Sequence, residues 1–388
     1  MRILAISDYY IPGFRGGTIR ALAHIVQRLS GRHEFWVITT NRDVSQTSAY
    51  PDIQPDAWTR QSDGSRVYYA DRSRLTSSVL RRLVLEVRPD LLFPFSVFSP
   101  FTIRLLAMRR AGVVPRLPVL IAPEGEFSPG ALAQKARKKE AFLRAARTLG
   151  LYRDVHWKAT SDLEAGDIKR SVGPQAVVHL SPSLPPPGPA VDRPRERIEK
   201  IAGHARFVYL SRVTPKKNLL FLLDRFAGLT GSCDLDIVGP TDDEVYGARC
   251  RERAASMPAG VRVTFTGEVP HERVAAELAL RHVFVLPTLG ENFGFAILEA
   301  FATGRPVIVS DRTPWRGLVQ HRAGWDLSLD DPGVWTTTLQ AAIDMDQATY
   351  EQWSESAWAF ARAYADLPRL EQALETAFAR ASARELRA

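Results

Sequence analysis

The segment from Val283 to Ser310 constrains the fold of this chain more than any other stretch. It begins with the continuous apolar run Val283–Pro287, passes through a glycine-containing loop into a helix-forming stretch, and ends with the apolar run Val307–Val309. Short continuous apolar runs are typical of strands that are buried on both faces. Gly304 and Pro306 are expected to end the helix between them. The order strand, loop, helix, strand predicts an α/β fold with a parallel sheet, which binds ligands at the carboxyl ends of its strands.

Two acidic residues and a helix N-terminus lie in this segment. Glu291 follows the first strand, and the free backbone amides after it belong to Asn292, Phe293 and Gly294. A carboxylate beside a positive helix terminus can orient sugar hydroxyls while the amides hold an anion. Glu299 lies about 12 Å further along the helix, which suits one extended ligand touching both acids. The alternative is that Glu291 only complements the helix dipole and that Glu299 is a solvated helix residue.

The full pattern P-x3-E-N-F-G-F-x3-E-A-F-A-x-G-R-P-V-I-V-S strongly resembles the Glu–seven residues–Glu signature of retaining glycosyltransferase family 4, part of the glycosyl transferases group 1. This resemblance implies the GT-B architecture, in which two Rossmann-like, doubly wound domains face each other across a cleft. It implies that a hexose-type sugar moves from a nucleotide-diphosphate donor to a sugar or lipid-linked glycan acceptor, as in surface polysaccharide or glycolipid synthesis. It also implies that Glu291 holds the sugar hydroxyls and Glu299 the ribose hydroxyls. The donor contacts implied for this segment are Glu291, Asn292, Phe293, Gly294, Phe295 and Glu299.

Length and composition agree with a two-domain globular protein. The chain has 388 residues, of which 45% are apolar and 24% charged, and it has no apolar run near the ~20 residues of a membrane helix. It enters a strand at Arg2 without a secretory signal, and Cys233 and Cys250 have neither metal-binding nor redox spacing. These features predict a reduced, cytoplasmic location.

The net charge of +8 and the pI of about 9.6 indicate anionic partners. No nucleic-acid-binding motif is present and the arginines are spread over the chain, which disfavours a nucleic-acid partner. Phosphorylated small molecules and peripheral contact with an anionic membrane surface remain as alternatives.

The first residues predict a strand–loop–helix–strand unit with strands at Arg2–Ser7 and Glu34–Thr39 and a helix from about Ile19 to Leu29. Gly16 and Gly17 precede that helix, where a backbone without side chains can approach phosphate closely. The loop lacks the G-x-G-x-x-G spacing, so a nicotinamide dinucleotide is disfavoured. It is similar to the glycine-rich first loop of family 4 enzymes, which implies that both glycines contact the donor diphosphate.

Asp90–Phe98 and Pro118–Ala122 predict further buried strands, and the second leads to Glu124 and Glu126. Many members of the family carry a histidine near the position of Glu124, close to the reacting sugar carbon. A catalytic role for Glu124 or Glu126 is therefore a hypothesis. The glutamate also supports an alternative in which the chain is a non-catalytic nucleotide-sugar-binding or assembly subunit. A GT-B nucleotide-sugar epimerase is a further alternative.

Other parts of the first half are expected to be structural or to face the acceptor. Thr40–Arg66 predicts a polar loop at the acceptor side, and Ala131–Leu149 predicts one basic amphipathic helix. Ser161 and Glu164 form a capping box that opens a helix after the strand Val155–Thr160. Two histidines in strand-like surroundings are expected to be structural, namely His156 and His179.

The clearest linker is Ser181–Pro194, which contains six prolines: Pro182, Pro185, Pro186, Pro187, Pro189 and Pro194. We therefore expect an acceptor-side domain at residues 1–190 and a nucleotide-sugar-binding domain at 195–364. The family resemblance implies that the last helix, about 365–388, returns to the first domain.

The second half restarts the alternation with a strand at Arg206–Ser211, followed by Arg212 and Lys217 before a helix that reaches Phe226. An arginine forks onto phosphate oxygens and a lysine adds a point charge, which suits a diphosphate, although a solvated loop would have the same composition. The spacing resembles the R-x4-K element of the family and implies that Arg212 and Lys217 bind the diphosphate and act in catalysis. Lys216 is the neighbouring alternative. A further strand is expected at Val261–Thr266. In the family the turn after this strand lies against the nucleotide base, which implies donor contacts at Gly267 and Val269.

No cofactor and no metal are expected. Asp234 and Asp236 form a D-x-D pair, but they lie at the start of a strand, away from the ligand-binding edge. Asp242, Asp243 and Glu244 follow that strand and fit the acidic first turn of a helix. The sequence therefore predicts metal-independent chemistry.

Overall fold

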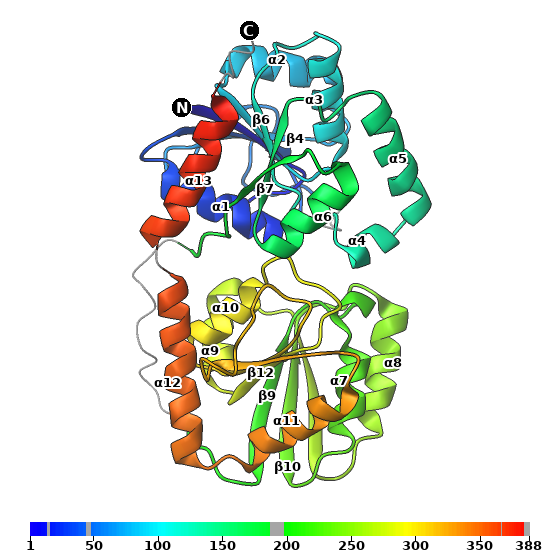
Figure 1. Cartoon of the computed structure of the whole chain (residues 1–388), viewed down its shortest axis with the longest axis vertical. Coiled ribbons are helices and arrows are strands. Elements are labelled where there is room, and N and C mark those ends of the chain that lie inside the picture. Colours follow the sequence, from blue (N-terminus) through cyan, green and yellow to red (C-terminus); the bar gives the residue numbers. More distant parts are fainter. Residues whose placement is uncertain (14–15, 44–47, 187–197, 366, 384–388) are drawn as a thin grey trace. The chain divides into compact units, whose positions relative to one another are not determined.

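The computed structural model describes residues 1–13, 16–43, 48–186, 198–365 and 367–383. The chain forms two compact units, shown in Figure 1. Unit 1 comprises Met1–Gly188 together with Leu367–Ala388, and unit 2 comprises Pro189–Asp366. Three prolines of the expected linker lie outside the described residues: Pro187, Pro189 and Pro194.

Unit 1 is built on an eight-stranded sheet in the order β3-β4-β2-β1-β5-β6-β7-β8. Neighbouring strands are parallel except for the antiparallel pair β3 and β4. The central strand β1 is buried along most of its length, as its apolar sequence requires. The strands are β1 Arg2–Ser7, β2 Glu34–Thr40, β3 Trp58–Arg60, β4 Arg66–Ala70, β5 Leu91–Phe95, β6 Val119–Ile121, β7 Val155–Ala159 and β8 Val177–Leu180.

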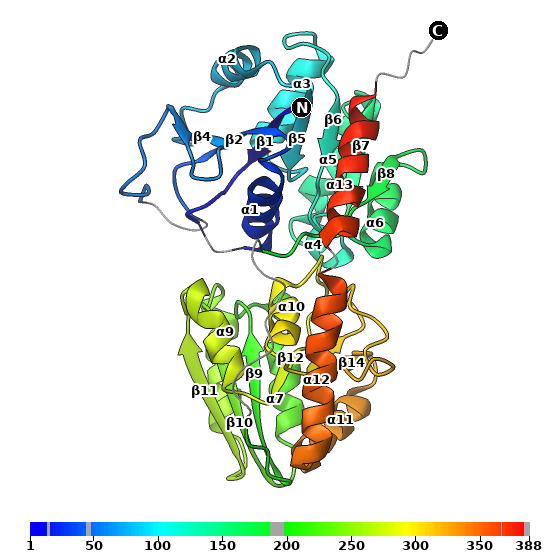
Figure 2. The same cartoon turned by 90° about the vertical axis from the view of Figure 1, so that its left-hand side faces the viewer.

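The helices of unit 1 include one from the far end of the chain. They are α1 Gly17–Leu29, α2 Ser77–Val87, α3 Pro100–Arg110, α4 Pro129–Ala133, α5 Ala136–Thr148, α6 Asp162–Val172 and α13 Leu367–Ser382. Helix α13 packs on strands β5 to β8, and Figure 2 shows it beside β7. Glu371 of α13 forms ion pairs with Arg28 and Arg32 at the end of α1, and Glu375 pairs with His33. The last helix therefore completes the unit that begins at the N-terminus.

Unit 2 is built on a six-stranded parallel sheet in the order β11-β10-β9-β12-β13-β14. The first strand of this unit, β9, lies in the middle of the sheet. The chain adds β10 and β11 on one side of it and then β12, β13 and β14 on the other side, so the winding reverses between β9 and β12. Its strands are β9 His204–Leu210, β10 Ser232–Val238, β11 Val261–Gly267, β12 Val283–Leu286, β13 Val307–Ser310 and β14 Gly324–Leu327. Its α-helices are α7 Leu219–Phe226, α8 Glu244–Ala255, α9 His271–Ala279, α10 Phe295–Ala302, α11 Pro332–Asp344 and α12 Gln347–Tyr364. The two units thus confirm the predicted Rossmann-like α/β fold.

Two sequence predictions in unit 1 are wrong in detail. The expected loop at 40–66 contains the short strand β3, which pairs with β4 through Trp58 and Tyr68. The expected single helix at 131–149 is two helices, because Gln134 is extended and Lys135 adopts a left-handed backbone at φ 56°. Ser128 caps the first of these helices, so it begins two residues before the predicted start.

In the described part of the chain, no helix combines the length and the apolar character needed to cross a membrane.

Candidate functional site

The candidate donor site lies in unit 2 where the winding of the sheet reverses. Strands β9 and β12 are neighbours, and the loops that leave their carboxyl ends begin at Ser211 and Pro287. Parallel sheets bind ligands at this kind of reversal because the two outgoing loops turn away from each other and leave room between them. The first loop carries Arg212 and Lys217, and the second carries Glu291. The topology therefore brings Lys217 next to Glu291, which lies 74 residues further along the chain.

Lys217 and Glu291 form a direct ion pair. Their side chains are only 12% and 13% exposed, so the pair is screened from most solvent and its interaction is stronger than that of a surface pair. The backbone joins the same two loops, because Leu289 donates its amide to the carbonyl of Lys216 at 2.8 Å. Of the two neighbouring lysines, it is Lys217 whose side chain meets the glutamate.

Arg212 pairs with a different acid, Asp242. Its guanidinium donates to Asp242 at 2.9 Å, and its side chain is 47% exposed. Tyr209 fixes the backbone here by donating its hydroxyl to the carbonyl of Arg212 at 3.3 Å. Asp242 is not part of the following helix α8, whose N-cap is Asp243. Asp242 thus holds the arginine at the carboxyl edge of the sheet, a contact that the sequence prediction missed.

Helix α10 begins at Phe295, and the residue before it, Gly294, has a left-handed backbone at φ 81°. A side chain at Gly294 would place its Cβ 2.8 Å from Ile297, so both conformation and space favour glycine here. Phe293 and Phe295 are buried, and the indole of Trp315 donates to the carbonyl of Phe293. Any contact of these two phenylalanines with an anion would therefore come from their backbone amides.

Glu299 contacts helix α9. Its carboxylate lies 3.8 Å from Nδ1 of His271, the first residue of α9. The turn before His271 contains Gly267, with φ 79°, and the half-buried Val269. The amide of Gly239 donates to the carbonyl of Gly267 at 2.8 Å and ties this turn to the end of β10. The residues predicted to contact ribose and base therefore lie on adjoining elements.

In unit 1, Gly16 is the N-cap of α1 and Gly17 its first residue, in the segment that follows β1. No atom lies within 4 Å of the position that a Cβ of Gly16 would take, so the space beside this backbone is open. Two serines follow the neighbouring strand β5, and Ser99 donates its hydroxyl to Asp8 at 2.7 Å. Burial raises the pKa of Asp8, while that hydrogen bond lowers it.

Glu124 lies after β6 with its side chain 7% exposed and its Oε1 3.4 Å from Nζ of Lys158. Glu164 from α6 belongs to the same cluster, because its carboxylate accepts from the amide of Gly125, the residue after Glu124, and the charge of Glu124 raises the pKa of Glu164. Burial is the larger cause, and the pKa of Glu164 rises to about 7. Lys158 was missed at the sequence level, although a lysine near the end of an apolar strand is unusual enough to have indicated it.

Glu126 turns toward the loop after β5. Its carboxylate accepts from the hydroxyl of Ser96 at 2.7 Å and from the amides of Val97 and Phe98. Burial raises the pKa of Glu126, and these donors oppose the rise. The donors occupy both carboxylate oxygens, so the contacts indicate that Glu126 fixes this loop.

The histidines expected to be structural contact each other. Nδ1 of His156 on β7 lies 2.8 Å from Nε2 of His179 on β8, and the rings are stacked. Burial, with smaller effects of His156 and Arg380, lowers the pKa of His179 to about 4. The pair therefore joins the last two strands of the sheet.

The D-x-D pair at the start of β10 is engaged in ion pairs. Asp234 contacts Arg262 and Asp236 contacts Arg281, each at 2.9 Å. Among the described residues, no group of three or more histidine, cysteine or acidic side chains is arranged to hold a metal ion.

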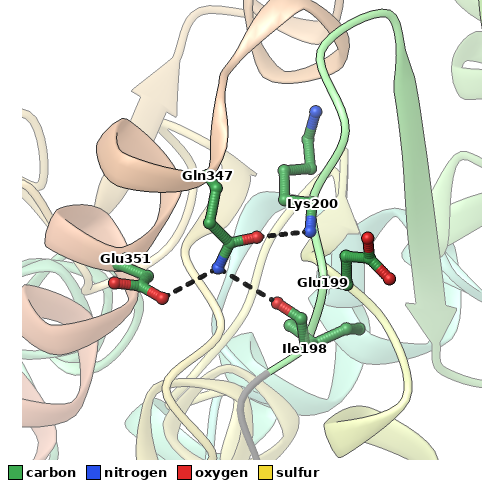
Figure 3. Close-up of a pocket in the computed structure, with 5 residues that line it drawn as sticks. All are labelled: Ile198, Glu199, Lys200, Gln347 and Glu351. Carbon is green, nitrogen blue, oxygen red and sulfur yellow. Dashed lines mark hydrogen bonds between the residues drawn. The ribbon is translucent and has the colours of Figure 1, made fainter.

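A separate pocket of about 350 Å³ lies where α12 begins, and Figure 3 shows the residues that line it. The carboxamide of Gln347 accepts from the amide of Lys200 at 2.6 Å and donates to Ile198 and Glu351. The ammonium of Lys200 points away from Gln347 and donates to the carbonyls of Ile343 and Met345 at the end of α11. Burial lowers the pKa of Lys200 to about 8. These contacts fasten the start of unit 2 to its last two helices.

Comparison with known proteins finds a family match within unit 2. Residues 204–344, which cover the core of unit 2, match the family described as glycosyl transferases group 1. The GDP-mannose-dependent alpha-(1-6)-phosphatidylinositol dimannoside mannosyltransferase of Mycobacterium tuberculosis is 27% identical over 335 residues, which are 80% of this chain and 79% of that protein. The phosphatidyl-myo-inositol mannosyltransferase of Mycobacterium leprae is 29% identical over 180 residues, so that match spans 46% of the relative's length and 44% of this chain.

Solved structures share the fold of the whole chain. The Anabaena protein HepE, crystallised with UDP and glucose, superposes with a TM-score of 0.71 at 16% identity over 98% of this chain and 99% of that one. Sucrose-phosphate synthase of Thermosynechococcus elongatus gives 0.74 at 16% identity, over 98% of each chain. Both comparisons show the GT-B fold. The core of unit 2 thus matches the glycosyl transferases group 1, and the predicted family 4 is consistent with this match, with the relatives and with the fold.

Proposed function

We propose that this chain is a retaining glycosyltransferase that moves a hexose-type sugar from a nucleotide-diphosphate donor to a sugar or lipid-linked glycan acceptor. The observation that carries the proposal is the pairing of Lys217 with Glu291 where the sheet of unit 2 reverses its winding, beside the start of α10. Several matched relatives are mannosyltransferases of phosphatidylinositol glycolipids, which supports a role in glycolipid or surface polysaccharide synthesis.

The adjacent cation and acid suit the phosphate and the sugar ring that are joined at the anomeric carbon of a donor. In a nucleotide sugar, the anomeric carbon links a phosphate to a ring that carries hydroxyls, so the two kinds of group lie a few ångströms apart. Lys217 and Arg212 would stabilise the diphosphate as the anomeric C–O bond breaks and the electron pair leaves on phosphate. Glu291 would hold the hydroxyls of the same sugar while its ring takes on oxocarbenium character.

The remaining donor contacts surround this pair. Amides of Asn292, Phe293, Gly294 and Phe295 at the start of α10 would add to the stabilisation of the leaving group. Glu299 would hold the ribose hydroxyls, and the turn with Gly267 and Val269 would meet the base. From unit 1, the amides of Gly16 and Gly17 would contact the diphosphate and Glu124 would lie beside the reacting carbon. No metal is required in this proposal, because the cations and amides supply the positive charge; activity that is lost in a chelator and restored by a divalent metal would refute that.

Binding of UDP-glucose, GDP-mannose and ADP-glucose, measured by thermal shift, is the first test, followed by turnover of the donor that binds. We expect Glu291→Ala and Lys217→Ala each to lower the turnover by about 100-fold or more, because each removes a group aimed at the developing charge or the reacting ring. Lys216→Ala is the matched control and should retain its activity. Wild-type turnover in both site variants would remove the assignment, and a loss in the control alone would move it to Lys216.

Product analysis separates the alternatives. A transferase needs an acceptor and yields a new glycoside, an epimerase yields an altered nucleotide sugar, and a binding subunit binds the donor without turnover. We also propose a cytoplasmic protein with peripheral contact to an anionic membrane, supported by the net charge of +8. Cosedimentation with anionic but not neutral vesicles, decreasing with added salt, tests that contact.

A further inference from the structure

Three charged side chains are buried together at the carboxyl ends of β6 and β7 in unit 1. The side chains of Lys158 and Glu124 are 1% and 7% exposed, and Glu164 as a whole is 3% exposed. They come from three elements, since Lys158 is on β7, Glu124 follows β6, and Glu164 is in the first turn of α6. Buried charges are costly unless paired, so such a group calls for an explanation.

Glu164 holds the turn on which Glu124 stands. Its Oε1 accepts from the amide of Gly125 at 2.6 Å, and its Oε2 accepts from the amide and hydroxyl of Thr160 at 2.8 Å each. Glu124 and Gly125 both have left-handed backbones, at φ 51° and 81°. A left-handed glutamate is strained and persists only where its surroundings impose it. The amide contact of Gly125 shows that Glu164 is part of what imposes it.

The charges of the cluster do not balance. Two carboxylates share one ammonium, so the group as a whole binds a proton more readily than an isolated acid does. The ionisable groups that face Glu164 are Glu124 and Lys158, and its other contacts are amides and a hydroxyl. Nζ of Lys158 lies 3.4 Å from Oε1 of Glu124, so a buried ion pair holds the Glu124 side chain in place.

We propose that Lys158 and Glu164 are positioning residues for Glu124, with Lys158 fixing the Glu124 side chain through their ion pair and Glu164 holding its strained turn. The inference rests on the proposed function, in which Glu124 lies beside the reacting carbon, and it assigns two residues that act only through that acid. Both residues belong to unit 1, so they should affect the chemical step and not the affinity of unit 2 for the nucleotide.

The test measures release of nucleoside diphosphate from UDP-glucose, GDP-mannose and ADP-glucose against pH, together with the Kd of UDP and GDP by calorimetry. We expect Lys158→Met to lower kcat at pH 7 by about tenfold or more, and to move the acid limb of the pH profile upward. The Kd of the nucleotide should stay within about twofold of the wild-type value. Adding Glu164→Gln to Lys158→Met should restore part of the loss, because it removes the competing negative charge.

Asp162→Asn is the control, since Asp162 is an exposed acid in the same turn of α6. Thermal melting of each variant checks that it is folded. If Lys158→Met does not fold, the kinetics and nucleotide affinity of Glu164→Gln alone are measured in its place. Additive losses with an unchanged pH profile would show that the cluster is only structural and would overturn the inference. A parallel loss of nucleotide affinity would do the same. A wild-type protein that neither binds nor cleaves any of the three donors would remove the proposed function, and this inference with it.

Discussion

The carboxyl group of Glu164 should make the stability of unit 1 depend on pH. Burial and the neighbouring Glu124 raise the pKa of Glu164 from 4.5 to about 7. Between these pH values the folded protein retains a proton that the unfolded chain has released. The free energy of unfolding therefore falls as the pH rises through this window, by on the order of 3 kcal/mol for the full shift.

Glu164→Gln removes this titration, so its stability relative to wild type should improve from about pH 5 to about pH 7 and then level off toward pH 8. Urea unfolding at four pH values measures the difference. Any loss of a hydrogen bond to Gly125 or Thr160 adds an offset that does not vary with pH. Asp162→Asn should show no such trend, and a constant difference for Glu164→Gln would contradict the assigned shift.

The candidate site could be predicted in part at the level of residues. The pattern from Pro287 to Ser310 indicates Glu291 because strand, loop and helix signals coincide there. The R-x4-K spacing favoured Lys217 and left Lys216 as the neighbouring alternative, because the orientation of the two side chains depends on the short 3₁₀ turn at Pro215–Lys217. Sequence reasoning missed Asp242 and Lys158, whose partners are remote in sequence and meet only through the sheet order.

At the scale of the element, the two ends of α10 offer a controlled comparison. Gly294 before the helix and Gly304 after it both have left-handed backbones, at φ 81° and 70°. Alanine at either position should cost about 1–2 kcal/mol, because L-residues are strained there. Only Gly294→Ala should also weaken binding of UDP or GDP, since its amide is one of those proposed to face the diphosphate. Thermal melting and calorimetry separate the two effects, and equal nucleotide affinities in both variants would argue against an anion site at this helix start.

Element boundaries were predictable where the signals are local. Ser161 caps α6 as expected, although Glu164 accepts from Thr160 and not from Ser161. The break between α4 and α5 was not predictable, because Lys135 is a good helix former and no glycine or proline marks the kink. Strand β3 was missed for a different reason. It has three residues, which are too few to show the alternation of apolar and polar side chains that is typical of a strand.

At the scale of the whole molecule, helix α13 should determine the stability of unit 1. Phe378 is fully buried there, with ring centroids 5.1 Å from Phe93 and 5.6 Å from His33. Phe378→Ala should lower the stability of unit 1 by about 3–5 kcal/mol through lost burial and the cavity left behind. Calorimetry should show the transition of unit 1 at lower temperature and that of unit 2 unchanged. Gln372→Ala, on the exposed face of the same helix, is the control, and equal shifts in both transitions would show that the units do not unfold separately.

The membership of α13 in unit 1 has a consequence for biosynthesis. Unit 2 occupies the sequence between the two parts of unit 1, so a ribosome finishes all of unit 2 before it makes the helix that covers β5 to β8. At typical translation rates the emerging first segment waits on the order of ten seconds or more with that face of its sheet unprotected. The domain that starts first is thus completed last, and chaperone binding, nonsense truncation or a bulky C-terminal fusion should each impair the N-terminal half of the protein before the C-terminal half.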